Sequence, residues 1–279
     1  MSDPDSDPIY REALILAELA AREAAEFIQS HAGAVAADLI HEKGLNDIVS
    51  FVDEGAQDII VGLIRRAYPD HHILAEEGFN PAELEPRHRE GYSWIVDPLD
   101  GTTNFMHGVP QYGISIALML NGKAMMGLVY DVCRGESFSA IRGAGARFGD
   151  ASCRVSRTSL LADSLIATGF PYKQFDYLDA YTECIRRFWQ DSRGVRRPGA
   201  ASLDLAWVAC GRFEGFFEQG LMPWDVAAGA LIVEEAGGRY SDFSDSDGAH
   251  LGSEIVASNQ LIHDEMIERL IPLRTADAK

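Results

Sequence analysis

The most informative stretch of the sequence is Trp94-Ile95-Val96-Asp97-Pro98-Leu99-Asp100-Gly101-Thr102-Thr103-Asn104-Phe105. Its apolar start predicts a short strand that ends at Asp97. Pro98 stiffens the turn that follows, and Asp100 comes three residues after Asp97, so two carboxylates share one tight turn. Oxygen ligands of this kind suit a hard divalent cation. An ordinary Asp-Pro-x-Asp-Gly turn, capped by its own side chains, explains the same residues.

The residues after Asp100 suit an anion and a water molecule. Gly101 allows the backbone to approach a ligand closely, and the amide groups of Gly101 and Thr102 would form a phosphate cradle if they open a helix. The Thr102 hydroxyl adds a group that can hold a water molecule. The stretch therefore predicts a metal and phosphate site if the fold brings further carboxylates to it.

Two other acidic segments can supply those carboxylates. Glu76 and Glu77 follow the apolar run 73–75, the same layout as at Asp97, and adjacent strands would bring the two segments together. Solvated loop charge is the other interpretation of this pair. Asp225 stands in the first turn of a predicted helix, where it serves either as an N-cap or as a metal ligand.

A fourth acidic residue, Asp53, follows the segment 46–52. Ser50 and Asp53 have the spacing of a capping box before an apolar helix, and this alone accounts for the carboxylate. From the residues alone, Asp53 can be either a helix cap or a functional residue.

The rest of the chain alternates between helical and strand-like patterns. A helical stripe begins at Ile9, and a second helix follows Ser50 and ends before Pro69. Apolar segments that meet at Asn121-Gly122 predict a hairpin within an antiparallel meander. We expect further helices at 178–189, 202–210, 226–236 and 260–270, and strands at 165–167, 213–218, 238–243 and 255–257. This mixture predicts a layered α/β or α+β fold.

Composition limits the kind of protein. The 279 residues carry 24 basic and 43 acidic side chains, a net charge of −19, which disfavours nucleic acid as a partner. No apolar run is long enough for a membrane span, and the acidic start lacks the features of a secretory signal, so we expect a cytoplasmic protein. Four widely spaced cysteines indicate reduced thiols rather than a zinc cluster. We expect a flexible acidic tail at 1–8 and a single domain at 9–275.

Taken together, these segments resemble the inositol monophosphatase family of magnesium-dependent, lithium-sensitive phosphatases. The family's motif D-P-[IL]-D-G-T-T-N-F is unbroken from Asp97 to Phe105, and W-D-x-A-A-G runs from Trp224 to Gly229. The paired glutamates and the D-x-V-[ST]-x-x-D element at 47–53 are also present. The resemblance covers roughly residues 10 to 270. It implies a layered α-β-α-β-α sandwich of the inositol monophosphatase and fructose bisphosphatase type.

The resemblance also implies a set of metal ligands. One Mg²⁺ would bind Glu76, Asp97 and the carbonyl group of Leu99. A second would bind Asp97, Asp100 and Asp225, and a third, more weakly bound ion would use Glu76 as a ligand. Oxygen ligands favour Mg²⁺ or Mn²⁺ over Zn²⁺. Li⁺ would inhibit by replacing one Mg²⁺.

Catalytic and substrate residues follow from the same resemblance. Thr102 paired with Asp53 would orient the attacking water, with Glu76 as the third catalytic residue. The substrate contacts implied are Gly101, Thr102, Ala201 and Glu218. Ala200 stands where a small hydroxyl residue is frequent in the family, and this departure puts the identity of the substrate in doubt.

The function implied is hydrolysis of a phosphate monoester by metal-activated water in a homodimeric enzyme, with inositol 1-phosphate as the best single substrate. Histidinol phosphate, fructose bisphosphate and an adenosine bisphosphate or other sugar or nucleotide phosphate are alternative substrates within the family. The intact segment Thr102-Thr103-Asn104 argues against the nucleotide option. A catalytically idle interaction or metal-sensing protein on the same scaffold is a different class of function, and the intact carboxylates argue against it.

Overall fold

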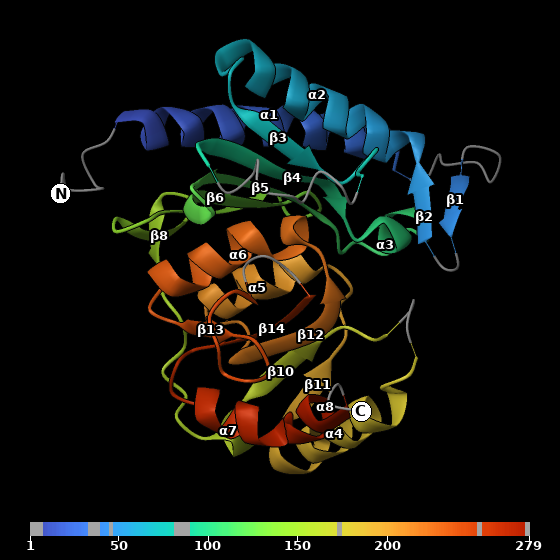
Figure 1. Cartoon of the computed structure of the whole chain (residues 1–279), viewed down its shortest axis with the longest axis vertical. Coiled ribbons are helices and arrows are strands. Elements are labelled where there is room, and N and C mark those ends of the chain that lie inside the picture. Colours follow the sequence, from blue (N-terminus) through green and yellow to red (C-terminus); the bar gives the residue numbers. More distant parts are fainter. Residues whose placement is uncertain are drawn as a thin grey trace.

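A computed structural model of the chain describes residues 8–32, 40–44, 47–80, 90–171, 175–249 and 253–276. Its elements stack in five layers, in the order helices, sheet, helices, sheet, helices, from top to bottom of Figure 1. The layered fold predicted from the sequence is therefore confirmed. The expected tail lies outside the described residues except for Pro8, which begins the first helix.

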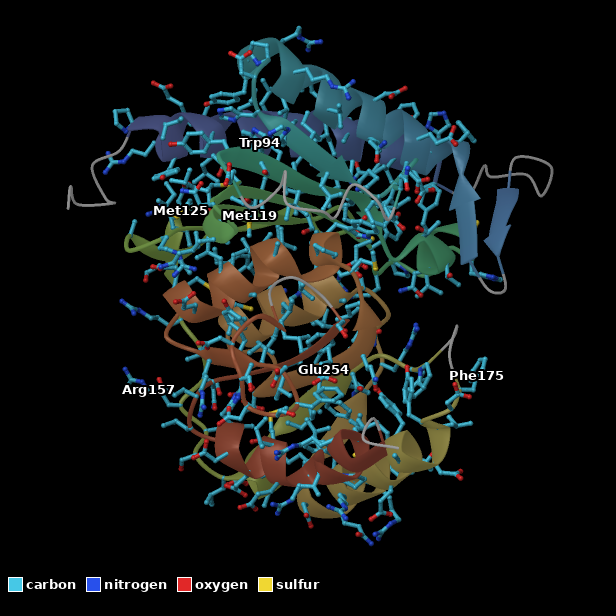
Figure 2. All side chains as sticks on the ribbon, in the orientation of Figure 1. Trp94, Met119, Met125, Arg157, Phe175 and Glu254 are labelled. Carbon is cyan, nitrogen blue, oxygen red and sulfur yellow. The ribbon has the colours of Figure 1, made fainter. Side chains whose placement is uncertain are left out.

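The first layer consists of α1 (Pro8–Ser30) and α2 (Phe51–Ala67), which lie side by side on the seven-stranded sheet (Figure 1). The inner face of α1 is built from fully buried alanines, which let the helix approach its neighbours closely. Ile60 and Ile64 of α2 are also fully buried and contribute about 1.5–3 kcal/mol each. Trp94, labelled in Figure 2, belongs to the hydrophobic core that these helices form with the sheet.

The seven-stranded sheet follows the order of the chain. Its strands are β3 (His72–Ala75), β4 (Tyr92–Asp100), β5 (Gly113–Leu120), β6 (Lys123–Asp131), β7 (Glu136–Ile141), β8 (Gly145–Phe148) and β9 (Ala151–Cys153). Only β3 and β4 pair in parallel; all other neighbours are antiparallel, as the predicted meander requires. Leu120 pairs with Lys123 across the predicted two-residue hairpin, and both Asn121 and Gly122 have positive φ.

The middle layer contains α5 (Ala201–Ala209) and α6 (Pro223–Glu235), enclosed between the two sheets (Figure 1). Nearly every residue of α6 is buried, because a helix with a sheet on either side needs an apolar surface all round. The start of α6 is tied to the upper sheet, since the Ser115 hydroxyl donates to the Trp224 carbonyl oxygen at 2.8 Å.

The second sheet and its outer helices complete the structure. The strand order is β11 (Gly194–Arg196), β10 (Leu165–Thr168), β12 (Gly215–Leu221), β14 (Ser253–Ser258) and β13 (Arg239–Ser241). The outer helices are α4 (Leu178–Asp191), α7 (His263–Arg269) and α8 (Ile271–Ala276), and the remaining elements are β1 (Ile40–Gly44), β2 (Asp47–Ser50), α3 (Thr102–Met106) and the 3₁₀ turn η5 (Leu161–Asp163). No helix within the described ranges is both long and apolar enough to cross a membrane. All four cysteines are free, as expected.

The prediction that a strand ends at Asp97 and turns tightly at Pro98 is wrong. The strand β4 continues to Asp100, and its pairing with β5 shifts on the way, from Asp97 opposite Ser115 to Asp100 opposite Gly113. Three steps along β4 match two along β5, so one extra residue is accommodated in a bulge. Proline suits such a position, because it has no N–H group to donate to a neighbouring strand.

Candidate active site

The parallel pairing of β3 with β4 brings the first two acidic segments together. Ala75 at the end of β3 is opposite Val96, so Glu76 follows directly beside Asp97. The Glu76 amide donates to the Val96 carbonyl oxygen at 3.2 Å, which fixes the backbone at this point. The backbone of Glu77 is held instead by Gln57, whose side-chain amide bonds both its N–H and its carbonyl group.

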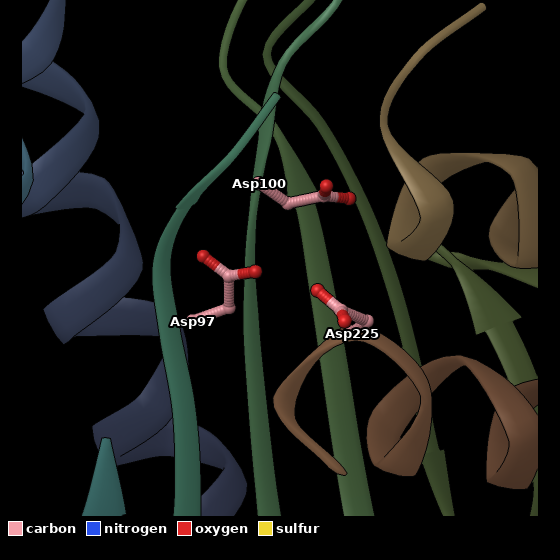
Figure 3. Close-up of side chains that lie close together, drawn as sticks. All are labelled: Asp97, Asp100 and Asp225. Carbon is pink, nitrogen blue, oxygen red and sulfur yellow. The ribbon is translucent and has the colours of Figure 1, made fainter. Parts of the chain in front are cut away.

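The bulge in β4 determines where Asp97 and Asp100 point. In a regular strand, residues three apart lie on opposite faces of the sheet. The extra residue in the bulge reverses this alternation, and Figure 3 shows both carboxylates facing the same space. The bulge, which the sequence did not predict, is therefore what turns both carboxylates of the motif toward the same space.

The third carboxylate, Asp225, comes from the first turn of α6 (Figure 3). Its Oδ2 accepts a hydrogen bond from the Met222 amide at 2.6 Å, so Asp225 is the N3 residue of a capping box in which Met222 is the N-cap. One oxygen atom from each of Asp97, Asp100 and Asp225 lies within 4.8 Å of the others. The N-cap interpretation of Asp225 is therefore wrong, although its side chain still supports the first turn of α6 while the carboxylate faces the cluster.

Asp100 is held in place by the start of α5. The amide and the hydroxyl of Ser202 both donate to Asp100 Oδ2, at 2.7 and 2.6 Å. Asp100 therefore keeps one orientation in the cluster, supported by two hydrogen bonds and by the N-terminal end of a helix.

The first turn after β4 holds the Thr102 hydroxyl against a buried carboxylate. Thr102 Oγ1 donates to Asp53 Oδ1 at 2.8 Å and approaches the Leu99 carbonyl oxygen at 3.1 Å. Asp53 is fully buried in α2. The side chain of Ser50 lies outside the described residues, so the predicted capping box stays a prediction.

Gly101 has a backbone conformation that would be strained for other residues. It has φ 92° and ψ 33°, in the left-handed region. A Cβ atom here would lie 2.9 Å from the Gln111 carbonyl oxygen and 3.3 Å from that of Gly199. A side chain at this position would therefore meet neighbouring backbone as well as an unfavourable φ angle.

These side chains line one pocket of about 360 Å³. Its lining includes Glu76, Asp97, Leu99, Asp100, Gly101, Thr102, Thr103, Arg197, Gly199, Ala201, Glu218, Leu221 and Asp225. Of the metal, catalytic and substrate residues that the resemblance implies, all but Asp53 line the pocket. Asp53 lies outside the lining and accepts the hydrogen bond of Thr102.

The arrangement has counterparts among known proteins. The sequence profile of the Inositol monophosphatase family matches residues 10–275. The chain belongs to the inositol monophosphatase family. It is 45% identical over 249 residues to the putative Nus factor SuhB of Neisseria meningitidis serogroup B, covering 89% of this chain and 94% of that protein. It is 40% identical over 257 residues to the Nus factor SuhB of Escherichia coli K12, covering 92% and 95%. Its structure matches the Thermotoga maritima IMPase with a TM-score of 0.85 and 34% identity, covering 95% and 99%.

Within this inositol monophosphatase fold, the carboxylate cluster has the electrostatics of a cation site. The pKa of Asp97 is raised well above its ordinary value by burial and then by the negative charges of Glu76, Asp100 and Asp225, against the opposing hydrogen bond from the Leu99 amide. Burial also raises the pKa of Asp100, although Ser202 opposes the shift. Several carboxylates cannot all ionise in a buried space without a counter-charge. The oxygen-only donor set therefore fits a hard divalent cation such as Mg²⁺.

The sequence alone assigns no role to two residues of this site. Ser202, which holds Asp100, directly follows Ala201, for which the resemblance implies a substrate contact, but its own spacing gave no indication of a partner. Arg197, on the rim of the pocket, is one of two adjacent exposed arginines, and exposed arginines are common on any surface. Neither could be distinguished from a structural residue without the fold.

Proposed function

We propose that the chain is a Mg²⁺-dependent phosphatase that hydrolyses inositol 1-phosphate to inositol and phosphate. The observation that carries the proposal is the cluster of Asp97, Asp100 and Asp225 in a pocket that also exposes Thr102. In this proposal residues 9–275 act as one catalytic domain. Membership of the inositol monophosphatase family supports both the reaction and the metal.

The metal ligands in this proposal are those named from the sequence. Glu76, Asp97 and the Leu99 carbonyl would hold one Mg²⁺, and Asp97, Asp100 and Asp225 would hold another. When bound, the ions would lower the pKa of a water molecule and stabilise the charge on the departing oxygen. Mn²⁺ would substitute, and Li⁺ would inhibit.

The protein groups around the metals would orient water and phosphate. Because the proton of Thr102 Oγ1 is donated to Asp53, the lone pairs of this hydroxyl are available to accept a hydrogen bond from water. Asp53 would thus act through Thr102 by fixing the direction of that hydroxyl. The amide groups of Gly101 and Thr102 would bind the phosphate oxygens.

The alcohol part of the substrate would lie against Ala201 and Glu218, which line the same pocket. A carboxyl group at Glu218 can bond neighbouring hydroxyl groups, which suits a polyol. Histidinol phosphate, fructose bisphosphate and nucleotide phosphates are the competing substrates. Phosphate release from a panel of these esters, with and without Mg²⁺, tests the proposal. Inositol 1-phosphate should have the highest kcat/KM, and a tenfold preference for another ester would replace it as the substrate.

A second candidate function is suggested by the names of two relatives. Proteins 45% and 40% identical to this chain are named as a putative Nus factor and a Nus factor. We propose that this chain can serve in that role as well as in catalysis, as a homodimer. Expression in an E. coli strain lacking its own SuhB tests this idea. Wild type and Asp97→Asn should both restore growth if the role is independent of catalysis, and failure of both would exclude the shared role.

A further inference from the structure

Arg197 is a feature of the pocket that the proposed reaction does not use. It lies between β11 and α5 and is the only basic residue among the described residues that line the pocket. The other charged residues in the lining are the acidic Glu76, Asp97, Asp100, Glu218 and Asp225. A cation at this position changes which substrates the pocket can accept.

The side chain of Arg197 is folded over the backbone next to the phosphate cradle. Its Nη1 lies 2.5 Å from the position that a Cβ atom on Gly199 would occupy, so a larger residue at 199 would displace it. The Gly199 carbonyl oxygen is in turn 3.3 Å from the corresponding position at Gly101. On the outer side, Cζ of Arg197 is 5.9 Å from the centre of the Phe170 ring. The guanidinium group therefore sits on the rim of the pocket.

The guanidinium group of Arg197 has no hydrogen-bond or ion-pair partner among the described residues. Two other arginines are paired with carboxylates: Arg142 bonds Glu234, and Arg212 bonds Glu136, each through two nitrogen atoms. A guanidinium group has five N–H donors in a fixed plane that matches a carboxylate or a phosphate. Arg197 thus has its donors available to a ligand.

Glu218, on the alcohol side of the same pocket, does not neutralise this cation. It is only 8% exposed, and burial raises its pKa to about 8, with the charge of Arg197 opposing the shift and that of Asp100 adding to it. At neutral pH the carboxyl group is therefore largely uncharged before any metal binds. Arg197 is thus the one positive side chain among the described residues of a lining whose other charged members are acidic, and it attracts an anionic substituent of the substrate.

We propose that Arg197 determines specificity by binding a second anionic group, a carboxylate or a phosphate, on the alcohol part of the substrate. The proposal rests on the proposed phosphatase reaction and adds a class of substrate to it. Phosphate esters with an anion near the ester bond are preferred over otherwise identical neutral ones.

Two pairs of substrates that differ only in the second anion test the proposal. One pair is 2-phosphoglycerate and glycerol 2-phosphate, and the other is fructose 1,6-bisphosphate and fructose 1-phosphate. Wild type should prefer the anionic member of at least one pair by about 10-fold in kcat/KM, as expected for a charge-assisted bidentate contact. The pair that shows the preference identifies the anion as a carboxylate or a phosphate.

Variants at two neighbouring arginines distinguish anion binding by Arg197 from a general effect of positive charge near the pocket. Arg197→Ala should reduce the preference to about one, whereas Arg197→Lys should retain part of it. The control is Arg196→Ala, because Arg196 is also exposed but bonds the Val195 carbonyl and does not line the pocket. It should keep the wild-type preference.

The inference is overturned if wild type shows no preference in either pair, or if the preference survives in Arg197→Ala. It is also overturned if Arg197→Ala lowers kcat/KM equally for all four esters, because Arg197 would then contact the reacting phosphate instead. Failure to release phosphate from every ester, inositol 1-phosphate included, would contradict the phosphatase proposal itself. The two failures are thus distinguishable.

Discussion

Replacement of Thr102 by valine removes one hydroxyl group and little else. The 2.8 Å hydrogen bond to the fully buried Asp53 is lost, which should cost about 1–3 kcal/mol of stability. With about 2.1 cal/mol/K of unfolding entropy per residue, the 279 residues give about 0.6 kcal/mol/K, so the melting temperature should fall by about 2–5 °C. This modest loss leaves the enzyme folded at assay temperature.

The effect of Thr102→Val on turnover should be much larger than its effect on stability. Loss of the group that orients the attacking water should lower kcat by about 100-fold, equivalent to about 2.7 kcal/mol, with KM little changed. Steady-state phosphate release at saturating Mg²⁺ and inositol 1-phosphate measures this. Thr102→Ser keeps the hydroxyl and should retain most of the activity. A Thr102→Val enzyme with near wild-type kcat would refute the role of the Thr102–Asp53 pair in catalysis.

Three further predictions concern the supports of the site and the outer helices. Ser202→Ala removes one of two hydrogen bonds to Asp100 and should raise the Mg²⁺ concentration needed for half-maximal rate several-fold, whereas an unchanged Mg²⁺ requirement would show that the amide suffices. Gly101→Ala places a side chain at φ 92° and should cost about 2 kcal/mol or more in chemical denaturation; an unchanged midpoint would contradict the strain. Burial lowers the pKa of His263 to about 4, below the value of 6.5 expected in the unfolded chain. The free energy of unfolding therefore holds the full contribution of neutral His263 above pH 6.5, and it falls by about 3 kcal/mol as the pH is lowered toward 4. In a matched pH series of melting curves, His263→Asn should lose less stability between pH 6.5 and 4 than wild type, and equal losses would exclude this assignment.

Burial is the main reason why protonation of His263 is unfavourable, and its hydrogen bonds are already complete in the neutral form. Ser241 donates its own proton to the Asp242 carbonyl oxygen, so it accepts a hydrogen bond from Nε2–H. Nδ1 accepts from the Ser258 hydroxyl at 2.9 Å, and a proton on Nδ1 would require this hydrogen bond to reverse its direction. Arg239 disfavours the cation, while Asp245 and Asp264 favour it but do not outweigh burial.

Much of the fold could be predicted because its hydrophobic periods are clear. The strands 113–120 and 123–131 and the hairpin between them follow from alternation and from Asn121-Gly122, whose positive φ angles few other residues tolerate. The last predicted helix, at 260–270, begins only at His263, and a separate α8 follows it. Strands β8 and β9 were not predicted, because three or four residues give no measurable period.

The site shows a different limit of sequence reasoning. The motif at 97–105 identified the carboxylates, but the expected turn at Pro98 is in fact a bulge, which depends on the register of β5 and cannot be derived from β4 alone. The contacts of Ser202 with Asp100 and of Thr102 with Asp53 join residues 102 and 49 positions apart. Contacts at such separations arise from the tertiary fold, which local patterns do not specify.

Phosphate release from inositol 1-phosphate as a function of Mg²⁺ concentration tests the central claim most directly, because both the metal site and the reaction enter one curve. Chelator-treated wild type should be inactive, and Mg²⁺ should restore the rate with saturation. Asp97→Asn should lose most activity at every Mg²⁺ concentration, because Asp97 would contact both ions in the proposed ligand set. Full activity in the chelated protein, or an Asp97→Asn variant that matches wild type at saturating Mg²⁺, would contradict the account.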